Sequence, residues 1–132
     1  MANFLFLAGS KSDDFGKEAN KSNPLPPCPD SPNCILITKF YNASKDVISR
    51  AAKSVIEKMD PAEMKIIDDP FRIRAVFKIF TFKDDFVLLV ENENDSSSRI
   101  HIRSSSRVGY SDLGVNRRRV KRFFKKLERN LN

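Results

Sequence analysis

The chain has 132 residues, of which 40% are hydrophobic and 31% charged, and its formal net charge is +7. A chain of this length and composition can bury one core, which excludes wholesale disorder, a collagen-like repeat and a scaffold held by disulfides alone. No apolar run approaches the roughly 20 residues that a spanning helix needs, so we expect no transmembrane segment. We expect an extended N-terminal arm over residues 1–27 and a single domain over residues 28–132.

The start of the chain does not read as a targeting signal. Residues 1–8 lack a basic n-region, and their apolar stretch is short for a signal peptide. We therefore expect a cytoplasmic or plastid location, with the cell envelope as the alternative.

Two cysteines lie in a proline-rich loop, and five residues separate Cys28 from Cys34. A structural zinc site needs four ligands, but the chain has one histidine and no third cysteine. The sequence therefore predicts no metal site and no other cofactor. The two cysteines either form a small loop-closing disulfide or remain thiols, and the compartment decides between these states.

Helical periodicity first appears after residue 44. A helix is predicted to begin near Lys45, with Asn42 or Ser44 as its cap, and to end before Asp60 and Pro61. Its apolar side chains recur on one broad stripe, as in a helix that packs on a core.

A second helix is predicted to end near Leu131. One arc of its helical wheel, about 100° wide, carries the apolar side chains. Asn116 falls inside this arc and Arg117 at its edge, so both are expected to engage other polar groups. The opposite side is expected to be solvated, and it carries Arg118, Arg122, Lys125 and Arg129.

Between the helices, four strands are predicted near residues 64–68, 72–83, 86–90 and 99–104. A bulge would explain a change of phase at Ile79 and Phe80, as would burial of the strand on both faces. We interpret Asp84 with Asp85 as a tight turn between two strands. His101 is expected to be an exposed strand residue.

The fold class is therefore α+β, with the order α-β-β-β-β-α. Short connections between successive strands favour an antiparallel sheet of about four strands, covered on one face by both helices. The other face is expected either to be solvated or to be covered by the N-terminal arm.

The positive charge is concentrated near the C-terminus. Residues 96–132 hold 11 basic and two acidic side chains, whereas residues 61–95 are mildly acidic. This asymmetry is typical of a face that binds an anion, or of a basic helix that complements acidic loops within one fold.

The polar segment over residues 104–119 also permits two interpretations. Its glycines, arginines and helix start suit a pocket for a phosphate or carboxylate. Alternatively, Ser111 or Asp112 caps the helix, and Arg107 pairs with Asp112, Asp84 or Asp85 to form a polar clasp. The candidate residues of this clasp or anion site are Asp84, Asp85, Ser104, Ser106, Arg107, Asp112, Asn116, Arg117 and Arg119.

Three functional hypotheses follow. The first is a non-enzymatic domain whose clasp binds a small anion or an acidic partner. The second is a nucleic-acid-binding module that uses the basic side of the last helix. The third is a hydrolase or transferase that uses Asp84, Asp85 and Asp112, which requires these carboxylates to converge on one pocket.

Two long motifs, together with a shorter one, resemble a known family. They are Pro27–Cys34, Ile102–Val120 and the intervening Phe82–Asp85, and together they are similar to the domain of unknown function 1499, found in small proteins of bacteria, cyanobacteria and plastids. The family continues after the second cysteine with Val-Ser-Ser, whereas this chain has Ile35–Ile37.

The resemblance implies no established activity, substrate or cofactor. Many relatives also carry a lipoprotein signal or a membrane anchor. The resemblance suggests one shared feature built from Asp84, Asp85, Arg107, Asp112, Asn116 and Arg117.

Overall fold

The computed structural model describes residues 23–68, 70–109 and 113–131. Within these residues the chain forms an α+β domain with the element order β-α-β-β-β-β-α, which confirms the predicted fold class. The elements are β1 (Cys34–Tyr41), α1 (Lys45–Lys58), β2 (Glu63–Asp68), β3 (Phe71–Ile79), β4 (Phe82–Asn94), β5 (Ser97–Ser106) and α2 (Val115–Leu131).

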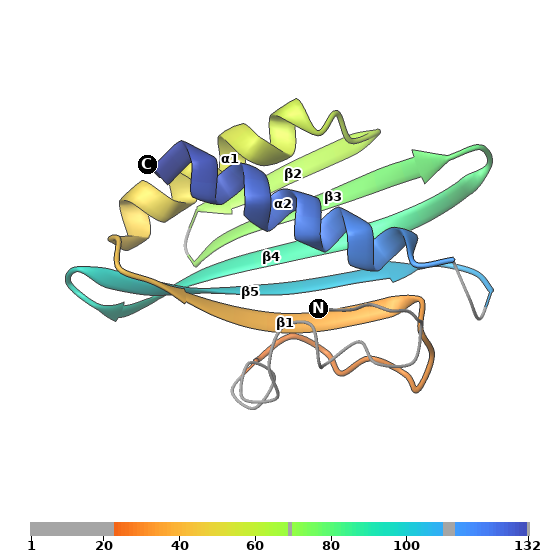
Figure 1. The fold of residues 1–132 in the computed structure, drawn as a ribbon, viewed down its shortest axis with the longest axis horizontal. Helices are drawn as coiled ribbons and strands as arrows, with labels where there is room; N and C mark the ends of the chain where they lie inside the picture. Colours follow the sequence, from red (N-terminus) through yellow and green to blue (C-terminus); the bar gives the residue numbers. More distant parts are fainter. Residues whose placement is uncertain (1–22, 69, 110–112, 132) are drawn as a thin grey trace.

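The strands form one antiparallel sheet in the order β1-β5-β4-β3-β2. Both helices lie on the same face of this sheet, and α2 runs along its middle strands (Figure 1). The chain is therefore a two-layer structure, in which one face of the sheet carries the helices and the other faces away from them.

β1 is a strand that the sequence did not predict. It begins directly after the proline-rich loop and pairs with β5, with Cys34 opposite Ser105. Its presence moves β5 into the interior of the sheet. The prediction that His101 is exposed is therefore wrong, because this side chain on β5 is fully buried.

The turn between β3 and β4 also differs from the prediction. The hairpin closes at Phe80 and Thr81, with Ile79 paired to Phe82, so the change of phase there marks the end of one strand and the start of the next. Asp84 and Asp85 are not a turn but lie within β4. The irregularity in β4 lies instead near its other end, between Asn92 and Asn94.

Alternate side chains of the strands point toward the helices and form the core. Phe86 of β4 and Phe123 of α2 are both fully buried, with ring centroids 5.7 Å apart. Each such side chain contributes about 1.5–3 kcal/mol when it is removed from water. The predicted apolar arc of α2 is confirmed, since Val120, Phe123, Phe124 and Leu127 are buried.

Ser44 caps α1, as predicted, because its side chain accepts a hydrogen bond from the amide of Val47. Phe71, Ile73 and Ala75 of β3 pack in the same core cluster as Ile48 and Ala52 of α1. None of the helices in the described part of the chain is both long and apolar enough to cross a bilayer.

The segment over residues 23–33 lies beside β1 and β5. Asn23 donates a side-chain hydrogen bond to the carbonyl of Ile37 in the edge strand β1, and Leu25 is buried. Arg103 of β5 donates to the carbonyls of Pro26 and Pro27. These contacts hold the segment along the edge of the sheet and over its outer side.

Candidate functional site

Asn116 is the centre of the polar clasp. It lies in the first turn of α2, is fully buried, and connects α2 to β5. Its Oδ1 accepts from the hydroxyl of Ser104, and its Nδ2 donates to the hydroxyl of Ser106 at 2.9 Å. Both serines point toward the helices because they lie on the same side of β5 as the apolar Ile102. Although Asn116 lies inside the apolar arc, both polar atoms of its side chain are hydrogen-bonded, as buried polar groups require.

Asp84 and Arg119 form a buried ion pair beside Asn116. Nη1 of Arg119 lies 2.8 Å from Oδ2 of Asp84, and the side chains are 4% and 7% exposed. The same guanidinium lies over the ring of Phe77, 4.8 Å from its centroid, and Nη1 also donates to Oδ1 of Asn116. The pair ties β4 to the first turns of α2, because neither charge can remain buried without the other.

Asp85 makes a different ion pair on the other side of the sheet. Arg107 approaches it with two nitrogens, Nε and Nη2, each 3.0 Å from a carboxylate oxygen. This hydrogen-bonded pair raises the pKa of the Arg107 guanidinium. The pair is nearly half exposed, so solvent screens it.

Successive residues of a strand point to opposite faces, and Asp84 and Asp85 do so here. Asp84 faces α2, and Asp85 faces away from both helices. The two carboxylates therefore do not converge on one pocket. Asp112, the third carboxylate of the hydrolase hypothesis, and Ser111, the other predicted cap, lie outside the described residues.

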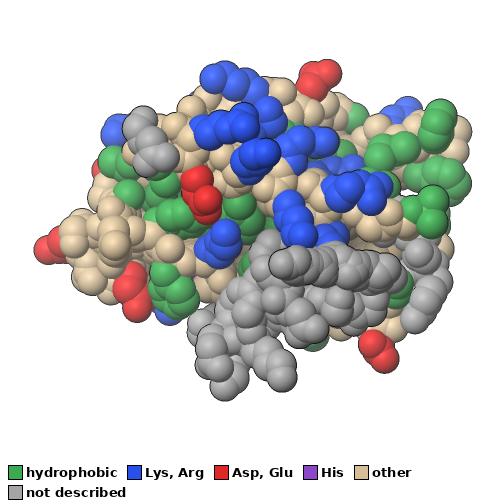
Figure 2. All heavy atoms as spheres, in the orientation of Figure 1, with side chains coloured by type: hydrophobic (Ala, Val, Ile, Leu, Met, Phe, Trp, Pro, Cys, Tyr) green, Lys and Arg blue, Asp and Glu red, His purple; other side chains and the backbone are tan. Residues whose placement is uncertain are grey.

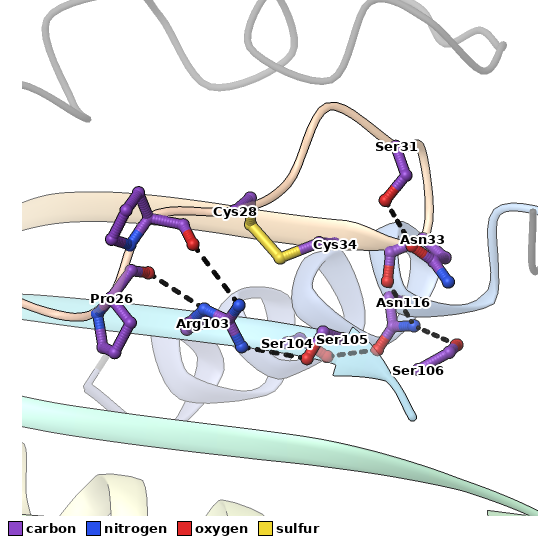
Figure 3. The surroundings of a disulfide bond; sticks show 11 residues. Pro26, Cys28, Ser31, Asn33, Cys34, Arg103, Ser104, Ser105, Ser106 and Asn116 are labelled. Atoms are coloured by element: carbon purple, nitrogen blue, oxygen red, sulfur yellow. Dashed lines mark hydrogen bonds between the residues drawn. A yellow bond between two sulfur atoms is a disulfide. The ribbon is translucent and has the colours of Figure 1, made fainter. Parts of the chain in front are cut away.

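The cysteine loop meets the clasp through Asn33 (Figure 3). The backbone carbonyl of Asn33 accepts from Nδ2 of Asn116 at 3.2 Å and from the amide of Ser106 at 3.1 Å. Its own side-chain nitrogen donates to the carbonyl of Gly109 at 2.6 Å. Asn33 was not among the predicted site residues, although it lies in the motif that precedes Cys34. The two long motifs of the sequence are thus in direct contact.

Cys28 and Cys34 form a disulfide in this structure. The bond closes the proline-rich loop on the outer side of β1, next to Arg103 (Figure 3). Arg103 donates from Nε to the Pro26 carbonyl at 2.9 Å and from Nη1 to the Ser105 hydroxyl at 3.1 Å. The loop is therefore held by one covalent bond and by the arginine beneath it.

His101 has two polar partners on the outer side of the sheet. Its Nε2 lies 2.7 Å from Oε1 of Glu91, and its Nδ1 lies 2.7 Å from the hydroxyl of Thr38. A neutral ring that donates from Nε2 and accepts from the hydroxyl at Nδ1 satisfies both. Burial lowers the pKa of His101, and nearby Arg99 lowers it further, while Glu91 acts in the opposite direction.

Sequence reasoning missed Thr38 and Glu91, because only the pairing of β1, β5 and β4 brings them to this histidine. No three His, Cys, Asp or Glu side chains within the described ranges are grouped so that they could hold a metal ion.

The arginines at the start of α2 divide into two groups. Arg117 and Arg119 are buried, and the predicted solvated residues Arg118, Arg122, Lys125 and Arg129 are exposed. Together with the exposed Lys121, these four residues form what we call the basic face, a band of blue side chains along α2 in Figure 2.

α2 carries eight basic residues and a single acidic one, Glu128. Glu128 accepts a hydrogen bond from the hydroxyl of Tyr41 at 2.7 Å and pairs with Lys39 at 3.4 Å. Burial, followed by the hydrogen bond to Glu128, raises the pKa of Tyr41 well above its usual range. One carboxylate against eight basic side chains leaves α2 strongly positive.

These features define a two-layer α+β domain in which a C-terminal helix is clasped to an antiparallel sheet and to a disulfide-closed loop. The chain belongs to the protein family of unknown function DUF1499, whose family model matches residues 24–127. The match includes both long motifs and every candidate site residue.

Two solved structures are similar to this one. The di-domain ARO/CYC BexL from the BE-7585A biosynthetic pathway matches with a TM-score of 0.53 and 9% identity, over 74% of this chain and 46% of that chain. The protein TTHA0849 from Thermus thermophilus matches with a TM-score of 0.39 and 11% identity, over 74% and 95%. This chain thus spans about half the length of BexL. At 9% identity, the likeness to BexL is one of fold alone. No curated protein matches the sequence.

Proposed function

We propose that this chain is a non-catalytic binding domain that recognises an acidic partner through the basic face of α2. The observation that carries the proposal is the division of charge on α2. Of its two buried arginines, Arg119 is held in the clasp, while five basic side chains of α2 are exposed. Such a band of one sign attracts anionic partners and speeds their association.

The clasp supports this function by fixing α2 rather than by binding the partner itself. Its polar groups already contact one another, since Asp84 pairs with Arg119 and Asn116 engages Ser104, Ser106 and Asn33. A small anion that entered the clasp would have to replace these buried contacts, which is costly. Fixing the first turns of α2 instead presents the basic face in one orientation.

A non-catalytic role is also supported by the arrangement of the carboxylates. The hydrolase or transferase hypothesis needs Asp84 and Asp85 beside one another on a substrate, whereas they face opposite sides of the sheet. General acid–base catalysis requires both groups within hydrogen-bond reach of the same reacting centre.

Retention on immobilised heparin, a polyanion, tests the proposal. The variant Arg122→Gln/Lys125→Gln removes two charges from the basic face, and Lys53→Gln/Lys58→Gln removes two exposed charges from α1 as a matched control. We expect the first variant to elute at clearly lower salt than the wild type, because fewer counterions are released on binding. The α1 variant is expected to elute close to the wild type. Equal shifts for the two variants, or no retention of the wild type at low salt, would contradict the proposal.

A further inference from the structure

Hydrophobic side chains gather at one end of the molecule. Of the seven large hydrophobic side chains exposed in the described ranges, five lie around the β3–β4 turn, the end of β5 and the start of α2. Figure 2 shows hydrophobic side chains gathered at this end, beyond the basic face. We call these five residues the apolar tip: Ile79, Phe80, Phe82, Val108 and Leu113. They line a groove with a volume of about 410 Å³.

Two residues of the apolar tip, Phe80 and Leu113, combine an exposed side chain with an unfavourable backbone conformation. Phe80 is 90% exposed with a φ of 55°, and Leu113 is 85% exposed with a φ of 58°. A positive φ is unfavourable for a bulky side chain by about 1–2 kcal/mol, which is why glycine is preferred where a hairpin turn requires such an angle. The Phe80 and Leu113 side chains are exposed and contribute little to the core. Packing within the domain therefore does not compensate for the unfavourable backbone conformation.

Basic side chains border the apolar tip. Lys83 and Arg118 line the groove itself, and Lys78 is exposed one residue before Ile79. The acidic side chain that lines the groove, Asp84, is buried and paired with Arg119. Through Arg118 the border is continuous with the basic face of α2, so apolar and cationic side chains occupy one connected surface.

We propose that the apolar tip docks on the surface of an anionic lipid bilayer. This inference rests on the proposed function, because it names the acidic partner of the basic face. The tip side chains enter the boundary between headgroups and acyl chains, while Lys78, Lys83 and Arg118 contact the anionic headgroups. A bilayer meets both requirements of the surface, since it offers an apolar layer directly beneath a negatively charged one. A nucleic acid offers phosphates but no partner for the aliphatic Ile79, Val108 and Leu113.

Co-sedimentation with vesicles tests the inference. We expect the wild type to bind vesicles of phosphatidylcholine mixed with phosphatidylglycerol, and to bind phosphatidylcholine alone far more weakly. The variant Phe80→Gly/Leu113→Gly removes two tip side chains. It also removes the backbone strain at both positions, because glycine adopts a positive φ without steric cost. It should therefore fold at least as stably as the wild type, yet bind the anionic vesicles at least about tenfold more weakly.

Phe40→Ser is the control, because it removes an exposed aromatic side chain from β1, away from the tip. It should leave vesicle binding unchanged. The natural chain has no tryptophan, so Phe80→Trp adds a single reporter whose fluorescence should shift to shorter wavelength when anionic vesicles are added. No shift, or unchanged vesicle binding by Phe80→Gly/Leu113→Gly, overturns the inference.

The heparin measurement separates this inference from the proposed function. Phe80→Gly/Leu113→Gly should be retained on heparin as the wild type is, because it keeps every charge of the basic face. If heparin retains the wild type through the basic face but vesicles do not bind it, the bilayer inference fails and the proposed function stands. If the wild type shifts an RNA duplex in a gel at low salt and does not bind vesicles, a nucleic acid replaces the bilayer as the partner. If neither heparin nor anionic vesicles bind the wild type, both proposals fail.

Discussion

Asn116 on α2 donates a hydrogen bond from Nδ2 to the backbone carbonyl of Asn33, 3.2 Å away and 83 residues earlier in the chain. The same amide group engages the hydroxyls of Ser104 and Ser106 on β5. One buried side chain therefore connects the cysteine loop, the last strand and the last helix, and its loss should affect all three.

Replacing Asn116 with alanine should lower the free energy of unfolding by about 2–3 kcal/mol, because several buried polar groups lose their partner. Arg122→Ala on the exposed side of the same helix should change it by no more than about 0.5 kcal/mol. Urea denaturation monitored by circular dichroism measures both variants. A similar, small loss in the two variants would show that the clasp does not stabilise the fold.

The buried pair of Asp84 and Arg119 should behave as a unit. Asp84→Asn alone leaves a buried guanidinium without its carboxylate and should cost about 3 kcal/mol or more. The double variant Asp84→Leu/Arg119→Met removes both charges and should cost less than Asp84→Asn. Denaturant midpoints decide the ranking, and a double variant less stable than Asp84→Asn would contradict it. Asp85→Asn is the control, since its pair with Arg107 is exposed and should matter little.

Opening the disulfide should weaken the fold. A loop of seven residues closed by a bond between Cys28 and Cys34 restricts the unfolded chain by about 2 kcal/mol. Reduction with dithiothreitol, and the variant Cys28→Ser/Cys34→Ser, should each lower the free energy of unfolding by this amount. The reductant should have no further effect on the serine variant. If reduction leaves the denaturant midpoint of the wild type unchanged, the bond does not contribute to stability.

Acidification should destabilise the protein through His101. Its pKa in the folded state is lowered from 6.5. The unfolded chain therefore binds more protons just below pH 6.5, and the free energy of unfolding falls as the pH drops through this range. Above about pH 6.5 the contribution of the neutral ring is fully present.

His101→Gln should give a flatter dependence of melting temperature on pH between about pH 7.5 and about pH 5, because glutamine does not titrate in this range. Differential scanning calorimetry across the range compares the two proteins. Parallel curves for the wild type and His101→Gln would rule out His101 as a source of the acid sensitivity. Glu91 acts against the lowering of the His101 pKa. The melting temperature of the Glu91→Gln variant should therefore fall more on acidification than that of the wild type.

The helices could be predicted because each depends on a local pattern. The apolar stripe and Ser44 defined α1, and the apolar arc of α2 separated Asn116 from Arg122 before any contact was known. A helical wheel needs only the spacing of residues along one segment. The polar residues inside such an arc are therefore visible in the sequence, although their partners are not.

The strands were harder to predict, because short apolar runs carry less information. β1 follows directly from a proline-rich loop, and without it His101 appeared to lie on an exposed strand. The phase change at Ile79 and Phe80 fits a bulge as well as a hairpin turn, since both reverse the alternation. Only the pairing of Ile79 with Phe82 distinguishes them.

By itself, the sequence determined the fold class, the family resemblance and the inward and outward sides of α2, because these follow from composition, motifs and local periodicity. The tertiary structure decided which charges meet. Asp84 and Asp85 are adjacent in the chain but are separated by the sheet, whereas Asn33 and Asn116 are distant in the chain but hydrogen-bonded. The apolar tip was likewise invisible in the sequence, because its side chains come from three segments that only strand register and helix docking bring together.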